Sequence, residues 1–87
     1  MKVTLFMFES CPHCKKALRL MDEVFSEHPE YKEIPFEMVD EQLEPERAAK
    51  YDYWYVPTFF VGDEKLHEGV IEKADVEKVF AFAKERE

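Results

Sequence analysis

The sequence predicts an α/β domain in which a four-stranded mixed sheet, in the strand order 2-1-3-4, is flanked by three helices. Apolar runs of strand length alternate with segments whose apolar residues recur every three or four positions, as in amphipathic helices. Two of the strands are apolar on both faces and two are partly polar, which distinguishes central from edge strands. At 87 residues, the chain has room for one such domain, over residues 1–87.

The first predicted strand covers residues 2–8. Its nearly continuous apolar run favours a central position. A helix then runs from Pro12 to about Glu27, since proline is well tolerated in a first helical turn and Pro29 lies just beyond. Its apolar stripe, with spacings of three and four, consists of Cys14, Ala17, Leu18, Met21, Val24 and Phe25.

The next strand covers residues 34–38, and Pro35 within it indicates an edge position, because proline cannot donate to a central ladder. Its apolar residues are Ile34, Phe36 and Met38. A strand–helix–strand unit of this length implies parallel pairing with a right-handed crossover. Pro45 then opens a short second helix that ends near Tyr51.

The third strand, Thr58–Val61, is apolar on both faces and is predicted to be central. The pair Gly62-Asp63 predicts a tight hairpin turn into a fourth strand, Lys65–Glu68, which has a polar outer face and ends at Gly69. A last helix covers residues 73–85, and its inward-facing residues are Val76, Val79, Phe80 and Ala83. The element order is β-α-β-α-β-β-α.

Composition excludes several classes of function. A formal net charge of −8, with histidines neutral, disfavours binding to nucleic acid or to an anionic membrane. No apolar run is long enough to span a bilayer, and Met1-Lys2 leads directly into the first strand without a signal-peptide pattern. We therefore expect a cytoplasmic, monomeric protein that binds neither nucleic acid nor membranes.

The two cysteines of the chain, Cys11 and Cys14, form a C-x-x-C pair between the first strand and the first helix. This is the layout of a thiol–disulfide redox site. The free N–H groups and positive dipole end of a helix start favour a thiolate, which is the reacting species. Because Cys14 belongs to the core-facing stripe and Cys11 to the turn, we expect Cys11 to be exposed and to attack, and Cys14 to be sheltered and to resolve.

A metal or iron–sulfur carrier that uses these thiolates is the alternative. Two cysteines supply half of a four-cysteine zinc site, and there is no second pair. His13, His28 and His67 could complete a site on paper, but His28 lies near the far end of the first helix and His67 on an edge strand. A redox-silent adaptor is a third possibility. Disulfide exchange itself needs no metal or organic cofactor.

Two neighbours are expected to tune the attacking thiol. An imidazolium or N–H donor from His13 would stabilise the Cys11 thiolate and therefore the reduced form. Glu9 acts in the opposite sense, because a nearby carboxylate disfavours a second negative charge. His13 could equally be an ordinary exposed turn residue.

Further motifs surround the C-x-x-C pair. Cys11-Pro12-His13-Cys14 follows the first strand, Val56-Pro57-Thr58 enters the third, and Gly69 follows the fourth. With residues 45–51 as a short second helix, this pattern resembles the thioredoxin fold in its small, glutaredoxin-sized form, over nearly the whole chain. The resemblance implies a cis Val56-Pro57 peptide that faces the cysteines. It also implies that Val56 offers its backbone to a bound substrate chain as a short added strand.

The resemblance also implies a function. Proteins of this kind exchange dithiols with disulfide-containing protein substrates and are reset by a reductase or a low-molecular-weight thiol, in electron transport and cell redox homeostasis. The resemblance makes Pro12 and His13 thiolate-tuning residues, and Val56, Pro57 and Gly69 substrate-binding ones. Trp54 and Tyr55, just before Val56, are interpreted as a partly exposed aromatic platform for substrate, the alternative being ordinary loop packing.

Glutathione-using glutaredoxins carry Thr-Val-Pro and Gly-Gly-x-Asp elements that hold the tripeptide. This chain has Tyr55-Val56-Pro57 and Glu68-Gly69-Val70 at these places, and Phe8 and Glu9 where a basic residue would precede the first cysteine. We therefore predict that glutathione is not specifically bound.

Overall fold

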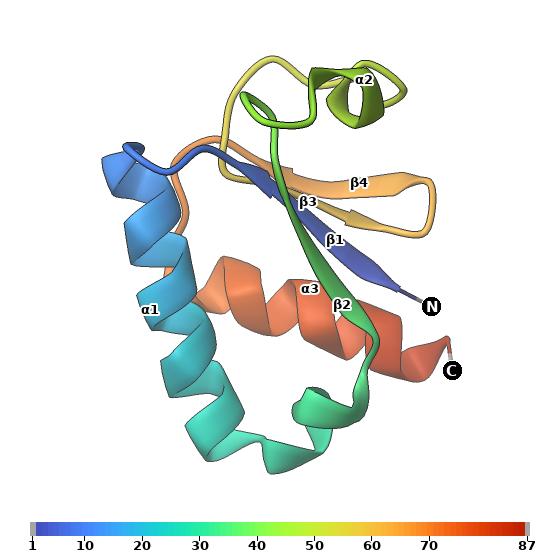
Figure 1. Ribbon diagram of the computed structural model, residues 1–87. Helices are drawn as coiled ribbons and strands as arrows, with labels where there is room; N and C mark the ends of the chain where they lie inside the picture. Colours follow the sequence, from blue (N-terminus) through green and yellow to red (C-terminus); the bar gives the residue numbers. More distant parts are fainter. Residues whose placement is uncertain (1, 87) are drawn as a thin grey trace.

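The computed structural model describes residues 2–86 (Figure 1). Its elements are β1 (Val3–Met7), α1 (Pro12–Glu27), the 3-10 helix η1 (Pro29–Glu33), β2 (Phe36–Asp40), α2 (Pro45–Ala48), β3 (Thr58–Val61), β4 (Glu64–Glu68) and α3 (Lys73–Glu85). The sheet order is β2-β1-β3-β4, with β1 and β2 parallel and the other pairs antiparallel. The predicted mixed sheet and its strand order are confirmed.

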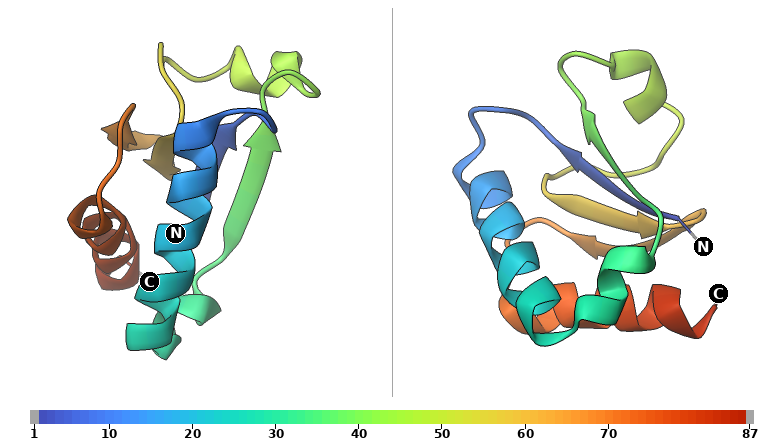
Figure 2. Two further views of the ribbon diagram at one scale, coloured as in Figure 1. Left: turned by 90° about the vertical axis from the view of Figure 1, so that its left-hand side faces the viewer. Right: turned by 60° about the horizontal axis from the view of Figure 1, so that its bottom comes forward.

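The helices cover both faces of the sheet. In Figures 1 and 2, α1 and α3 lie on one face and α2 lies on the other. Alternate residues of β1 point to these two sides: Leu5 packs in the large cluster with α1 and α3, whereas Phe6 packs against Val39 and Phe60 in a second cluster. Covering on both faces explains why every residue of β1 is buried.

Several element boundaries differ from the prediction. β1 is one residue shorter at each end than residues 2–8, and α2 ends at Ala48 rather than near Tyr51. β2 begins two residues later than predicted, because η1 occupies the residues before it and Ile34 caps that short helix. None of the helices in the described residues 2–86 is long and apolar enough to cross a membrane.

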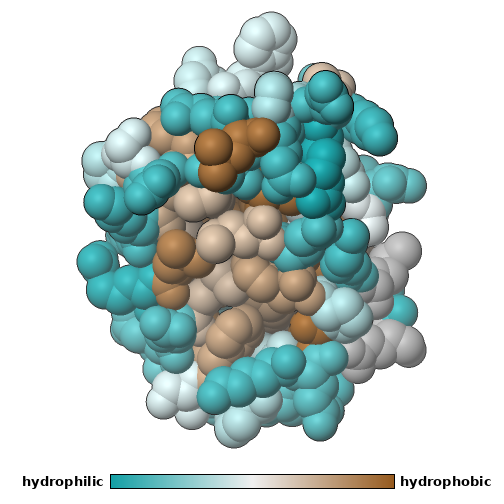
Figure 3. All heavy atoms as spheres, viewed as in Figure 1, coloured by the Kyte–Doolittle hydropathy of each residue, from teal (hydrophilic) through white to brown (hydrophobic). Residues whose placement is uncertain are grey.

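β2 is an edge strand, as Pro35 indicated, and its apolar residues are only partly covered. Phe36 is 37% and Met38 45% exposed, whereas Val39, on the other face, is fully buried. Figure 3 shows apolar side chains gathered in the middle of this side of the molecule, within a hydrophilic rim. Pro35 lies just before the strand, where its carbonyl accepts the Val3 N–H at 2.8 Å.

Phe80 of α3 is the aromatic centre of the larger cluster. It is fully buried, and its ring lies 5.0 Å from Phe25, measured between centroids. The rings of Tyr31, Phe36 and Phe59 lie 6.2–6.4 Å from it. One side chain therefore joins α3 to α1, η1, β2 and β3, and supports the sheet on which the cysteines are mounted.

Replacing Phe80 with alanine is expected to lower the free energy of unfolding by about 3–5 kcal/mol, because the cavity would open beneath four elements at once. Urea denaturation followed by circular dichroism measures this. The matched control is Phe82→Ala, two residues further along the same helix and only partly buried, which should cost roughly 1–2 kcal/mol. Equal losses in the two variants would contradict the central place given to Phe80.

Candidate active site

The start of α1 holds the sulfur of Cys11. Cys11 is the N-cap residue, with φ −79° and ψ 115°, and Pro12 occupies the first turn, as predicted. The backbone N–H of Cys14 donates a hydrogen bond to the Cys11 Sγ at 3.2 Å. The sulfur therefore accepts an N–H of the first helical turn, as the side-chain oxygen of an N-cap residue ordinarily does. The positive end of the helix dipole also favours negative charge at this position. Both features stabilise a thiolate at Cys11.

The predicted exposure of Cys11 is wrong. Cys11 is only 4% exposed and Cys14 only 1% exposed, and both are free thiols. The N-cap side chain folds over the first turn toward the Cys14 N–H instead of pointing into solvent, and the Cys11 N–H is itself bonded to the Phe8 carbonyl at 3.2 Å. The two sulfurs therefore differ in their surroundings rather than in their exposure.

Cys14 lies in surroundings that keep it protonated. Burial, first of all, and then the hydrogen bond with Cys11 raise the pKa of the Cys14 thiol to about 12. The negative charges of Cys11 and Glu41 also raise the pKa of Cys14, whereas a hydrogen bond with the Phe8 backbone lowers it. At neutral pH, Cys14 is thus a neutral thiol packed among the core residues.

Glu41 was not singled out from the sequence. Its backbone N–H bonds the Met7 carbonyl at 2.8 Å, which extends the β1–β2 pairing toward the cysteines. Its carboxylate accepts a hydrogen bond from the Tyr53 hydroxyl at 2.6 Å. The available signal was its position just after β2, since the carboxyl ends of two parallel strands meet at one edge of the sheet.

Val56-Pro57 is a cis peptide, as the resemblance implied. Val56 packs against the cluster that contains both cysteines, and Pro57 is buried. The Pro57 carbonyl accepts the Gly69 N–H at 2.9 Å, and Gly69 has a φ of +87°, in the left-handed region that favours glycine. Val56 therefore packs on the same core cluster as the two cysteines, and Gly69 is bonded to Pro57.

Trp54 and Tyr55 are 85% and 71% exposed, so ordinary loop packing is excluded for these two side chains. Tyr51 and Tyr53 pack instead against Phe6, with ring centroids 4.7 and 5.0 Å away. The loop is bound by Glu68, which sequence reasoning did not assign to the site: its carboxylate accepts the backbone N–H groups of Trp54 and Tyr55. No local periodicity indicates this contact, because it joins segments 13 and 14 residues apart.

The three histidines have different places. His13 is exposed beside the cysteines, as are Pro12 and Glu9. His67 is not the plain surface residue that its edge strand suggested: its Nε2 lies 2.7 Å from the Val70 carbonyl, and its side chain is only 17% exposed.

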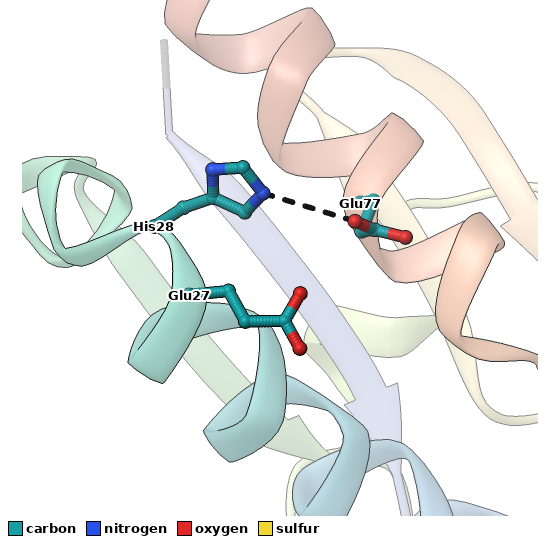
Figure 4. A group of neighbouring side chains, drawn as sticks. All are labelled: Glu27, His28 and Glu77. Carbon is teal, nitrogen blue, oxygen red and sulfur yellow. Dashed lines mark ion pairs between the residues drawn. The ribbon is translucent and has the colours of Figure 1, made fainter.

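His28 lies at the other end of α1, about 24 Å from Cys11 along a helix of 16 residues. There it forms a group with Glu27 and Glu77, whose potential metal-ligating atoms all lie within 4.8 Å of one another (Figure 4). The ammonium group of Lys73 already pairs with Glu27. Neither cysteine belongs to this group, so His28 does not extend the dithiol into a metal site.

Known proteins resemble this chain in sequence and in fold. Residues 1–81 match a family model described as a thioredoxin domain. A curated thioredoxin from Methanocaldococcus jannaschii is 34% identical over 79 residues, which cover 90% of this chain and 91% of that protein.

Two solved structures extend the likeness of fold. Oxidised thioredoxin from Plasmodium falciparum has a TM-score of 0.70 at 19% identity, and the match covers 93% of this chain and 78% of that one. Reduced desulfothioredoxin from Desulfovibrio vulgaris Hildenborough has a TM-score of 0.66 at 24% identity, and the match covers 93% of this chain and 79% of that one. The family match, the archaeal relative and the dithiol at the helix start agree, and the chain belongs to the thioredoxin family.

Proposed function

We propose that the protein is a cytoplasmic dithiol–disulfide oxidoreductase that acts on protein disulfides through Cys11 and Cys14. The observation that carries this proposal is the contrast between the two sulfurs. Both are buried, but the Cys11 sulfur accepts a backbone N–H at a helix start, whereas the pKa of the Cys14 thiol is raised. Membership of the thioredoxin family supports a thiol–disulfide oxidoreductase in general and does not favour the metal-carrier alternative.

The reaction would proceed in two exchanges. The Cys11 thiolate attacks one sulfur of the substrate disulfide, forms a mixed disulfide and releases the other sulfur as a thiolate, which takes up a proton. Cys14 then loses its proton and attacks the Cys11 Sγ, so that the Cys11–Cys14 disulfide forms and the second substrate thiolate leaves. The substrate gains two electrons and two protons in total. A reductase or a low-molecular-weight thiol returns two electrons to the protein.

The cis-proline loop would hold the substrate during these steps. Val56 packs against the core cluster that includes both cysteines, and its backbone would pair with an extended substrate segment, as the family resemblance implies. Trp54 and Tyr55 would add apolar contact area at the edge of this site. We propose that the active form is the monomer.

Cys11→Ser is expected to abolish disulfide reduction, because the attacking sulfur is lost. Cys14→Ser should instead accumulate a covalent adduct with the substrate, because the mixed disulfide has no resolving thiol. Turnover of insulin disulfides measures the first effect, and mass spectrometry of the acid-quenched reaction measures the second.

Alkylation of the reduced wild-type protein at neutral pH provides the control for this assignment. Iodoacetamide should modify Cys11 ahead of Cys14, since the pKa of Cys14 is raised. Faster modification of Cys14, or adducts that accumulate on the Cys11→Ser variant, would reverse the two roles.

His13 is proposed to make the disulfide more oxidising. Thioredoxin has a potential of about −270 mV and the periplasmic oxidase DsbA, which owes its value to a stabilised reduced form, about −120 mV. We expect roughly −250 to −180 mV here, since His13 and Glu9 oppose one another. His13→Val should lower the potential, as measured by equilibration with dithiothreitol buffers. An unchanged or higher potential would show that His13 does not make the disulfide more oxidising.

A further inference from the structure

The loop that carries Trp54 and Tyr55 is packed on the core through Tyr53 before this pair and Val56 after it, but not through the pair itself. It connects α2 to β3 without regular secondary structure, and both aromatic side chains point into solvent. A loop of this kind is ordinarily mobile, and ordering it on binding would reduce affinity. Core packing fixes the residues on either side, so polar contacts must hold the backbone of Trp54 and Tyr55 themselves.

Glu68, at the end of β4, supplies that restraint. One oxygen of its carboxylate, Oε2, accepts the backbone N–H groups of both Trp54 and Tyr55, the latter at 3.0 Å. The other oxygen, Oε1, accepts the ammonium group of Lys65 at 2.8 Å. Lys65 also donates to the Asp52 carbonyl at 3.3 Å. Two side chains of β4 thus bind three positions of the loop, Asp52, Trp54 and Tyr55.

The sheet register places Glu68 where it can do this. Thr58, the first residue of β3, is paired with Glu68, and the β3–β4 register shifts between Phe59 and Phe60. The Thr58 hydroxyl donates to the Tyr55 carbonyl, so the loop is also bound from β3. The Glu68 side chain itself is only 21% exposed.

We propose that Glu68 is a positioning residue that, with Lys65, holds the Trp54–Tyr55 segment rigid as a docking platform for an extended polypeptide beside the dithiol. The proposal rests on the proposed function and adds to it the residue that gives protein substrates their advantage over small disulfides. Val70, which follows Gly69, is also exposed, at 62%. The partner segment would present an apolar side chain to this surface.

Ionisation of Glu68 is consistent with this role. The ammonium group of Lys65 and the N–H groups of Trp54 and Tyr55 lower the pKa of the Glu68 carboxyl from 4.5 to about 2. Lys65 is the charged side chain bonded to it. A carboxyl whose pKa is depressed on folding stabilises the bonded loop above its ordinary pKa and loses this effect as the pH falls through its folded value. The platform should therefore be fully held at neutral pH.

The test compares Glu68→Ala and Glu68→Gln with wild type and with the control Glu64→Gln, an exposed residue at the other end of β4. Trp54 is the only tryptophan of the chain, so its fluorescence reports on this loop alone. In Glu68→Ala, its anisotropy should fall and the Trp54 and Tyr55 amides should exchange faster. Glu68→Gln, which keeps an acceptor oxygen, should give intermediate values.

Kinetics separate positioning from a general loss of structure. Glu68→Ala should raise the KM for insulin disulfides about five- to tenfold with little change in kcat, because two hydrogen bonds to a charged group are lost. Turnover of the small disulfide 5,5′-dithiobis(2-nitrobenzoate) should not change, nor should any property of Glu64→Gln. An unchanged KM for insulin, or equal losses with both substrates, would overturn the proposal.

The two proposals fail in distinguishable ways. If wild type reduced neither substrate, the oxidoreductase assignment would fail, and the anisotropy and amide exchange of Trp54 would still decide whether Glu68 holds the loop. If wild type reduced both and Glu68→Ala changed neither loop mobility nor KM, only the positioning role would be wrong. Should Glu68→Ala fail to fold, Glu68→Gln gives the comparison in the same direction with smaller effects.

Discussion

One hydrogen bond, from the Cys14 N–H to the Cys11 Sγ, organises the chemistry of this protein. It exists because β1 ends just before the cysteines and α1 begins at Pro12, so that the first turn of the helix presents a free N–H to the preceding side chain. The same turn carries Cys14 into the core. A helix start thus sets the two sulfurs of one motif in opposite electrostatic surroundings.

The core and the active site are parts of one packing unit. Cys11 and Cys14 belong to the cluster that includes Val3 and Phe80, and Val56 packs against it from the proline loop. Around this unit, polar side chains from distant segments fix the loops: Glu68 binds the loop before Val56, and the His67 ring contacts the carbonyls of Gly69 and Val70. The rigid parts of the site come from the sheet, and the exposed parts come from loops that the sheet restrains.

Local pattern predicted most of the fold. The bounds of α1, β3 and α3 follow from apolar periodicity and from prolines, and the strand order follows from which strands are apolar on both faces. The burial of Cys11 could not be predicted in this way, because it depends on a side-chain rotation over the helix start. The bonds of Glu68 and Glu41 could not be predicted either, because they depend on strand register, including the shift between Phe59 and Phe60. The η1 helix was missed because its five residues are too few to show a period.

The most direct test of the contrast between the two sulfurs is a pH titration of the reduced protein by NMR, with the Cβ of each cysteine followed separately. The Cys14 backbone amide should respond to changes at the Cys11 sulfur, because that N–H is bonded to it. The Cys14 Cβ should keep its thiol position until the pH approaches about 12. Ionisation of the Cys14 thiol near neutral pH, or a Cys14 amide that does not respond to Cys11, would contradict the account.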